Sequence, residues 1–353
     1  MAAKRWRVGV AGLGHWYSGF GLARAMPEYA RAELVAVAWP NEAQRTQFAS
    51  MFGLESHASY EELLARKDID IVHIAPPVVD IPALTIAAAR ACKHIILGKP
   101  MAMSLAQADE MVAAVARAGV VCVPWQALFR VGQAGLKRRL EAGEIGEVKV
   151  VHATGRWSIA EDWPASGRPG WFADPACVPG GSFIDEGIGD CDRVRWLVGS
   201  EVVRVEGKVA NYVHLDVAPL EDWGFATFTF ANGAHATLEY SWTTNAPKKT
   251  GPSPKQNAFR QLEIVGTRGE IVTSTLQEPS TAVLRGGAAG WDFERRLPEP
   301  YGPQPPGALD HLIDCVESGK APTARIEDAR EALRLALAFY RAARTGQPVD
   351  PRV

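Results

Sequence analysis

The feature that most constrains this chain is a regular alternation of short apolar runs and alanine-rich segments over its first 122 residues. The runs are rich in valine and isoleucine and the segments between them have helical spacing; examples are ELVAVAW (33–39), HIILGKP (94–100), PALTIAAARAC (82–92) and LAQADEMVAAVARAG (105–119). This order is typical of βαβ crossovers, and continuous apolar strands indicate a parallel sheet covered on both faces. We therefore predict a doubly wound α/β domain over residues 1–124.

The pattern changes beyond EIGEVKVVHATGRW (144–157), where longer strands alternate apolar and polar side chains. Two such stretches, residues 223–242 and 260–274, contain the tight turns ANGA and GTRGE. This combination is typical of antiparallel strands with one exposed face. Two amphipathic helices, at about 308–318 and 326–344, close the chain after PEPYGPQPPG, which proline content predicts to be a loop. We predict an α+β domain over residues 125–353, with closing helices that could pack back on the first domain.

Composition narrows the class of protein. Of the 353 residues, 47% are hydrophobic and 22% are charged, the formal net charge is -2, and lysine and arginine are spread along the chain. This composition favours a globular protein and provides no basic block for nucleic acid. No apolar run approaches the roughly 20 residues that a membrane-spanning helix needs, so we expect neither a membrane partner nor secretion.

Cysteine and histidine spacing favours neither disulfides nor metal. The cysteines are odd in number and form no C-x-x-C pair: Cys92, Cys122, Cys177, Cys191 and Cys315. His152, His214 and His235 lie in strand patterns without metal-ligand spacing. We therefore expect reduced thiols, a cytoplasmic location and no bound metal.

A glycine-rich turn follows the first predicted strand, in VAGLGHWYSGF (10–20). Gly12 and Gly14 occupy positions at which a dinucleotide-binding loop turns tightly and meets a pyrophosphate, but Tyr17 replaces the third glycine. Either Gly19 or Gly21 could supply the missing close approach of helix and strand. The alternative is a plain strand-to-helix turn of small residues. We predict that the loop holds a dinucleotide through Gly12, Leu13, Gly14, His15, Trp16 and Tyr17.

The end of the second predicted strand lacks the acid that commonly binds the ribose of NAD. Trp39 stands there, followed by Asn41 and, one helical turn later, Arg45. Without the carboxylate a 2′-phosphate is not repelled, and Arg45 could pair with it. In the alternative, Trp39 packs against adenine and Arg45 is solvated. Both NAD and NADP therefore remain candidate cofactors.

Several motifs in order give the chain a family resemblance. They are GLG at 12–14, IAPP at 74–77, ACKHIILGKPMA at 91–102, GEIGEV at 143–148 and the long motif WFADPACVPGGSFIDEGIGDCDRVRWLVG at 171–199. Together they resemble the glucose-fructose oxidoreductase, inositol dehydrogenase and MocA family, over nearly the whole chain. The resemblance implies an N-terminal Rossmann domain, a C-terminal domain with a large, mostly antiparallel open sheet, and NAD(P) meeting a sugar, polyol or similar alcohol between them. It also implies a homodimer or homotetramer joined through that sheet.

The resemblance also assigns roles to individual residues. Lys99 matches the lysine of a Glu-Lys-Pro triplet, with Gly98 in place of the glutamate, and Asp185 matches an aspartate that follows a glycine-rich turn. Gly189 stands where the family has a histidine credited with moving the hydroxyl proton. Further cofactor contacts are expected at Ala75, Pro76, Pro77, Gly98, Lys99, Pro100 and Gln126.

The chemistry can be argued from the residues as well. Oxidation of an alcohol needs a base for the hydroxyl proton, and burial and the positive nicotinamide ring would both lower the pKa of Lys99 toward that task. Asp185 could bind a substrate hydroxyl or orient Lys99, although aspartate is also an ordinary helix N-cap. Without a histidine at 189, the proton could be handled by Lys99 alone, or by one of Asp185, Glu186, Asp190 and Tyr240. The glycine would also open room for a bulkier substrate.

Aromatic and basic residues near residues 156–171 are candidates for substrate binding. Trp157, Trp163 and Trp171 could offer faces to a sugar ring, or could pack their loop onto the domain. Arg156 and Arg168 could bind an acidic group, or could be solvated. The predicted substrate contacts are Arg156, Trp157, Trp171, Asp185, Glu186 and Gly189.

Three functions are compatible with this sequence. The first is an NAD(P)-dependent oxidoreductase that transfers hydride to or from a sugar, polyol or related cyclic alcohol or ketone, with Lys99 as the main acid–base residue. The second is a non-catalytic sensor or regulatory protein that binds a dinucleotide. The third is an enzyme that recycles tightly bound NAD within an elimination or hydrolysis cycle.

Overall fold

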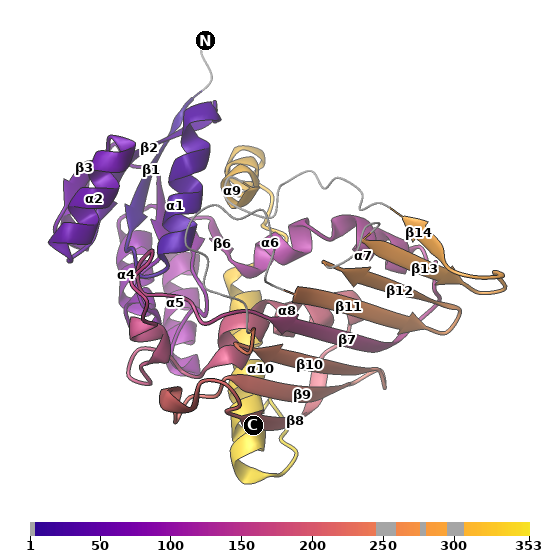
Figure 1. Ribbon diagram of the computed structural model, residues 1–353. Coiled ribbons are helices and arrows are strands. Elements are labelled where there is room, and N and C mark those ends of the chain that lie inside the picture. Colours follow the sequence, from indigo (N-terminus) through magenta and orange to yellow (C-terminus); the bar gives the residue numbers. More distant parts are fainter. Residues whose placement is uncertain (1–3, 245–258, 276–279, 295–306) are drawn as a thin grey trace.

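The computed structural model describes residues 4–244, 259–275, 280–294 and 307–353. The first part of the chain forms a six-stranded parallel sheet in the order β3-β2-β1-β4-β5-β6 (Figure 1). The strands are β1 (Trp6–Ala11), β2 (Ala32–Ala38), β3 (Glu55–His57), β4 (Ile71–Ile74), β5 (His94–Leu97) and β6 (Cys122–Pro124). The predicted doubly wound fold is confirmed.

Helices cover both faces of this sheet. The helices are α1 (Trp16–Ala25), α2 (Glu42–Phe52), α3 (Tyr60–Ala65), α4 (Ile81–Arg90) and α5 (Leu105–Ala118). Residues of α1 and α2 share one buried cluster with β1, and residues of α3, α4 and α5 share another with β4. Ser104 shows why α5 begins where it does, because its hydroxyl accepts a hydrogen bond from the amide of Gln107. Gly119 ends the same helix in the left-handed conformation, at φ 65°.

The second sheet has eight strands in the order β14-β13-β12-β11-β7-β10-β9-β8. Among the strands that the structure describes, only β7 and β10 pair in parallel, so the expectation of a mostly antiparallel sheet is confirmed. The strands are β7 (Val148–Arg156), β8 (Val202–Ala210), β9 (Trp223–Phe230), β10 (His235–Ser241), β11 (Phe259–Gly266), β12 (Gly269–Ser274), β13 (Thr281–Arg285) and β14 (Asp292–Glu294). Figure 1 shows α8 (Ser182–Val198) and α10 (Ile326–Thr345) behind the sheet, and no described helix in front of it.

The last helices join the two parts of the chain. Helix α9 (Gly307–Ser318) contributes Leu309 and Leu312 to the cluster beneath α1. Helix α10 packs against β8 and α8, and also against α5 and β6 of the first sheet. The loop predicted at 298–307 lies almost wholly outside the described residues. A division into residues 1–124 and 125–353 remains a prediction.

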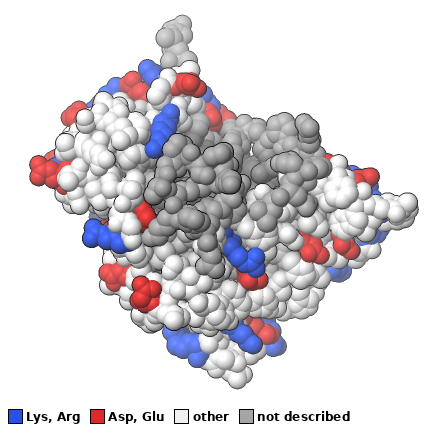
Figure 2. Space-filling view, in the orientation of Figure 1, with Lys and Arg blue, Asp and Glu red and all other residues white. Residues whose placement is uncertain are grey.

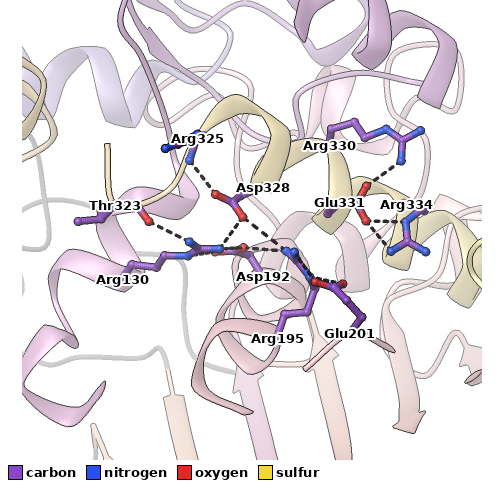
Figure 3. Close-up of polar contacts among 10 residues, drawn as sticks. All are labelled: Arg130, Asp192, Arg195, Glu201, Thr323, Arg325, Asp328, Arg330, Glu331 and Arg334. Atoms are coloured by element: carbon purple, nitrogen blue, oxygen red, sulfur yellow. Dashed lines mark hydrogen bonds and ion pairs between the residues drawn. The ribbon is translucent and has the colours of Figure 1, made fainter. Parts of the chain in front are cut away.

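A buried polar network ties α10 to α8 and to α6 (Gln126–Val131), as Figure 3 shows. The Arg130 guanidinium donates to both carboxylate oxygens of Asp192, at 2.8 and 2.5 Å, and to Asp328 Oδ1 at 2.9 Å. Arg130 also donates to the carbonyl of Thr323 at 2.8 Å. Because the Asp192 carboxylate is fully buried, these bonds must compensate for its lost hydration. The network therefore fixes the end of α6 relative to α8.

The surface and the thiols add little to the site. Figure 2 shows acidic and basic side chains interspersed over the described part of this face, without a large patch of one sign. None of the described helices has the length and apolar character needed to cross a membrane. All five cysteines are free thiols.

Candidate active site

The glycine-rich loop packs tightly against the turn after β4. A Cβ atom on Gly12, whose φ is 96°, would lie 2.4 Å from Pro76 N, and one on Gly14 would lie 2.6 Å from Pro77 N. Only glycine fits either position. By contrast, a Cβ on Gly19 would touch Leu13 at an ordinary 3.4 Å, and one on Gly21 would meet nothing within 4 Å. The expectation that Gly19 or Gly21 supplies the close approach was therefore wrong.

The loop leaves an anion site at the start of α1. Among the described residues no hydrogen-bond acceptor faces the amides of Trp16 and Tyr17, which open the helix. The first turn of α1 contains no acidic residue. Unpaired amides at a helix N-terminus bind phosphate groups, so this loop fits the pyrophosphate of a dinucleotide.

His15 and Tyr17 have acquired packing roles beside that loop. His15 is buried, its Nδ1 lies 2.9 Å from the Pro76 carbonyl oxygen, and burial lowers its pKa to about 4. Leu13 is fully buried in the core. Tyr17 packs against a small cluster that includes Phe172 and Trp242 from the second part of the chain. In place of the third glycine, Tyr17 therefore contributes a contact between the nucleotide loop and the second part of the chain.

The predicted ribose region is occupied by contacts within the chain. Trp39 Nε1 donates to Gln44 Oε1 at 2.7 Å, and the Asn41 side chain caps α2 by accepting from the amide of Gln44. Arg45 Nη1 donates to the carbonyl of Trp39 at 2.7 Å. Arg45 is therefore bound to the main chain in this structure, whereas one of the two alternatives placed its side chain in solvent.

Three tryptophans join the nucleotide loop and α2 to the segment 158–178. Trp171 Nε1 donates to the Gly14 carbonyl at 3.2 Å, and Trp16 Nε1 donates to the Glu161 carbonyl at 2.7 Å. Trp163 Nε1 donates to Gln47 Oε1 at 3.3 Å. Trp163 and Trp171 thus pack this segment onto the first sheet, as the packing alternative described.

Lys99 and Asp185 meet at the carboxyl edge of the first sheet. Lys99 follows β5, and its Nζ donates to Asp185 Oδ1 at 2.5 Å and to the main-chain oxygen of Asp185. Trp242 Nε1 donates to Asp185 Oδ2 at 3.0 Å. The N-cap of α8 is Gly181, so Asp185 lies inside the first turns and is not a cap. The hydrogen bonds from Lys99 and Trp242 hold both carboxylate oxygens of Asp185 in place.

The residues beside Lys99 explain its placement. Gly98 donates its amide to the Ile74 carbonyl at 3.1 Å, and a Cβ atom there would lie 2.8 Å from that oxygen. The close strand contact accounts for glycine where the family triplet has glutamate. Pro100 is buried after Lys99, and Gln126 is buried at the first position of α6. Ala75, with Pro76 and Pro77, forms the turn against the glycine-rich loop.

The expected fall in the pKa of Lys99 does not occur in this structure. Burial by itself would lower the pKa, but the Asp185 carboxylate, and then Tyr17 and Glu186, outweigh burial and raise it. Lys99 is therefore an ammonium at neutral pH. It can donate a proton or a hydrogen bond, but it is not a ready base.

A cavity of about 620 Å³ opens beside this pair. Its lining combines charged groups with aromatic and aliphatic side chains, among them Tyr17, Lys99, Trp125, Leu128, Phe129, Leu136, Trp157, Asp185, Glu186, Gly189, Arg193, Arg260 and Leu262. Of the predicted substrate contacts, Trp157, Asp185, Glu186 and Gly189 line the cavity. Arg156 does not: its guanidinium reaches Glu239 at 3.1 Å, across the sheet face that the helices leave uncovered.

Gly189 does not enlarge the cavity. A Cβ atom at this position would lie 2.2 Å from Cε2 of Phe129, which projects from α6. The expectation of extra room was therefore wrong, because the Phe129 ring occupies the space that a side chain at 189 would need. Nothing in the sequence around Phe129 signals this role, since the contact depends on how α6 meets α8.

Two of the residues proposed to carry the proton, Asp190 and Tyr240, are fully buried inside the protein. Asp190 is fully buried and accepts hydrogen bonds from the Tyr240 hydroxyl and from Arg260 Nη1, the latter at 2.8 Å. Arg193 pairs with the same carboxylate. Neither Asp190 nor Tyr240 lines the cavity. Glu186 does, and burial together with the charge of Asp185 raises its pKa to about 7.

Comparison with known proteins gives the family. Residues 6–125 match the oxidoreductase family with an NAD-binding Rossmann fold, and residues 134–272 match the GFO/IDH/MocA C-terminal domain. The chain belongs to this family. It is an NAD(P)-dependent oxidoreductase of the type that acts on CH–OH groups, as the motifs predicted.

Relatives of known activity extend over almost the whole chain. A scyllo-inositol 2-dehydrogenase (NAD(+)) of Bacillus subtilis is 31% identical over 98% of this chain and 96% of its own. A myo-inositol 2-dehydrogenase of Thermotoga maritima is 26% identical over 94% of each. Among solved structures, an aldose-aldose oxidoreductase of Caulobacter crescentus superposes with a TM-score of 0.81 at 23% identity, covering 98% of this chain and all of that one. This likeness shows the shared fold.

Proposed function

We propose that this protein oxidises a sugar, polyol or related cyclic alcohol, or reduces the corresponding ketone, with Lys99 as the main acid–base residue. The observation that carries the proposal is the position of the Lys99 ammonium. It is held by Asp185 at the carboxyl edge of the Rossmann sheet and faces a cavity beside the nucleotide loop. Ligands of open α/β sheets bind at this edge.

The cavity suits a neutral polyhydroxylated ring. Its charged lining is nearly balanced, since Lys99 pairs with Asp185 and Arg260 pairs with Asp190. Trp157, Phe129 and Trp125 provide aromatic faces of the kind on which sugar rings stack. The names of the inositol dehydrogenases among the relatives support the same substrate class.

The residues of this chain would handle the proton and the orientation of the substrate. When bound, the nicotinamide accepts or supplies the hydride. Lys99 donates a hydrogen bond to the reacting oxygen and gives up its proton when a ketone is reduced, while Asp185 keeps the ammonium in place. Gly12, Gly14 and the first amides of α1 would hold the pyrophosphate, with the turn Ala75–Pro77 beside them. Trp39 would cover the adenosine.

The uncovered face of the second sheet supports a homodimer or homotetramer. Trp223 and Phe225, both half-buried, stack on this face with ring centroids 6.3 Å apart, and Tyr212 beside them is 65% exposed. Aromatic side chains that gather on an uncovered surface mark an interaction site. Sedimentation of the wild type and of Phe225→Lys, which puts a charge on this face, tests the assembly.

Cofactor binding is the first test. Quenching of tryptophan fluorescence would follow NADH and NADPH binding to protein freed of nucleotide, and we expect saturable binding of at least one. Oxidation of scyllo-inositol and myo-inositol is then measured by the absorbance of the reduced cofactor. If neither nucleotide binds at millimolar concentration, the oxidoreductase proposal is abandoned for a sensor or scaffold.

Lys99→Met tests the chemistry, with Lys93→Met as its matched control. Lys93 is also buried, but its Nζ donates to the carbonyls of Arg66 and Ile69, away from the cavity. We expect Lys99→Met to keep nucleotide binding and to lose about 10²- to 10⁴-fold in kcat, the usual share of acid–base catalysis. Equal activity of wild type and Lys99→Met would favour the non-catalytic alternative. Product formation without net change of cofactor would favour the recycling alternative.

A further inference from the structure

The proposed function leaves one proton without an acceptor. Alcohol oxidation releases a hydroxyl proton, yet Asp185 keeps Lys99 charged, and a charged ammonium cannot take up a further proton. The family's histidine, which would accept it, is Gly189 in this chain, and Phe129 fills the space around that position. Another group on the cavity must complete the transfer.

Glu186 lies next to the place that the histidine ring would have occupied. It precedes Gly189 by three residues on α8, so the two positions share one face of the helix. Helical side chains tilt toward the N-terminus, and a side chain at 189 would therefore reach over residues 185 and 186. The Glu186 side chain lines the cavity and is 16% exposed.

The other candidates are less suited to accept the proton. Both carboxylate oxygens of Asp185 already accept hydrogen bonds, from Lys99 and from Trp242. Tyr17 lines the cavity, but burial raises its pKa and keeps its hydroxyl protonated. The Glu186 carboxylate has an ionic partner at 4.0 Å, Arg260 Nη2, and its side chain also hydrogen-bonds with that of Asp185, which raises the pKa of Glu186. Because two neighbouring carboxylates favour the uptake of a proton, Glu186 is suited to accept the hydroxyl proton.

We propose that Glu186 accepts the hydroxyl proton during alcohol oxidation and returns it during ketone reduction. The inference rests on the proposed function. In the oxidative direction the substrate C–H bond breaks, and bound NAD(P)⁺ would take up its electron pair as hydride. The O–H bond breaks with its proton ending on the Glu186 carboxylate, either directly or as Lys99 takes this proton and passes on one of its own. The products are a ketone, NAD(P)H and a neutral Glu186, and Lys99 is an ammonium both before and after the transfer.

The charges around Glu186 set the pH at which it can work. Burial raises its pKa, and the charge of Asp185 on the same helix and the hydrogen bond with that side chain act in the same direction, while Lys99 after β5 and Arg260 on β11 lower it. Tyr17 on α1 also faces it but stays neutral. The resulting pKa is about 7. Oxidation should therefore gain from rising pH through neutrality, and reduction should gain from falling pH, as for a general acid–base group near the operating pH.

Glu186→Gln, which keeps the shape and removes the carboxylate, is the decisive variant. We expect NADH affinity within twofold of wild type, a loss of about 10²-fold or more in kcat for oxidation at pH 7, and no kcat inflection near pH 7. Glu186→Asp should restore part of kcat and the inflection. The matched control is Glu221→Gln. Glu221 is buried with a pKa also raised to about 7, but it binds the amides of Gly181 and Phe183 away from the cavity. This control should keep the inflection.

A second measurement does not depend on turnover. Infrared difference spectra of the NADH complex between pH 5 and pH 9 should contain a carboxylic acid band, distinct from that of Glu221, that titrates near neutrality, disappears in Glu186→Gln and remains in Glu221→Gln. Persistence of both the band and the kinetic inflection in Glu186→Gln would overturn the inference while leaving the proposed function intact. Failure of the wild type to bind nucleotide or oxidise any polyol would refute the proposed function, and the inference with it.

Discussion

The close approach of Gly189 to Phe129 predicts that Gly189→Ala destabilises the protein, whereas the same change at an uncrowded helix position stabilises it. In a helix interior, replacing glycine by alanine normally stabilises by about 1 kcal/mol. At position 189, however, the new Cβ would lie 2.2 Å from the Phe129 ring, whereas ordinary contact begins at 3.4 Å. The ring would have to move by more than 1 Å, which would disturb its contacts with the guanidiniums of Arg193 and Arg260, 5.9 and 5.0 Å from the ring centroid.

The magnitude follows from these two opposing effects. Overpacking of this kind costs about 1–3 kcal/mol, so Gly189→Ala should destabilise the protein by up to about 2 kcal/mol after the gain in helix propensity. In a Phe129→Ala background the clash is gone, and the same substitution should stabilise by about 1 kcal/mol. The double-mutant coupling energy is then about 1–3 kcal/mol.

Urea unfolding of the four proteins, at equal cofactor concentration, measures that coupling. Gly21→Ala is the matched control, because Gly21 also lies within a helix but a Cβ there meets nothing within 4 Å. It should stabilise by about 1 kcal/mol in both backgrounds. If Gly189→Ala stabilises the wild type as much as Gly21→Ala does, Phe129 does not occupy the space and the argument about the missing side chain fails.

Three further predictions concern other parts of the molecule. Asp192→Asn breaks the buried network of Figure 3 and should cost about 3 kcal/mol in urea unfolding, against less than about 1 kcal/mol for Glu331→Gln in the partly exposed cluster beside it; equal costs would contradict the assigned burial. Burial lowers the pKa of His73 to about 4, so the folded protein should lose up to about 3 kcal/mol as pH falls from 6.5 to 4, and His73→Gln should reduce that slope. Arg45→Ala should weaken NADPH binding no more than NADH binding, because Arg45 is held by the Trp39 carbonyl; a selective loss of NADPH would show that it binds the 2′-phosphate.

Local periodicity explains why most elements could be predicted from the chain. The strand at 33–39 and the helix at 105–119 each bury one set of side chains at the spacing that their structure requires, and the structure places β2 and α5 within a residue of them. The antiparallel strands at 223–242 followed in the same way from alternation and a tight turn. Such patterns are local, so they survive without knowledge of the fold.

Only part of the site could be predicted from the sequence. Lys99 and Asp185 were found through motifs, and the structure brings their side chains together although 86 positions separate them. The pKa of Lys99 could not be inferred from motifs, because burial and the Asp185 charge act in opposite directions and only their distance decides which prevails. Likewise, no property of a glycine at 189 reveals whether the space around it is empty or filled.

The sequence by itself determined the two sheets, the family and the identity of the charged pair, because these depend on spacing along the chain. Only the tertiary structure decided that Arg156 faces away from the cavity, that Asp190 and Tyr240 are sealed from it, and that Glu186 lines it. The physical reason is that burial and charge act through space. A side chain becomes an acid, a base or a packing group according to the neighbours that the fold brings to it.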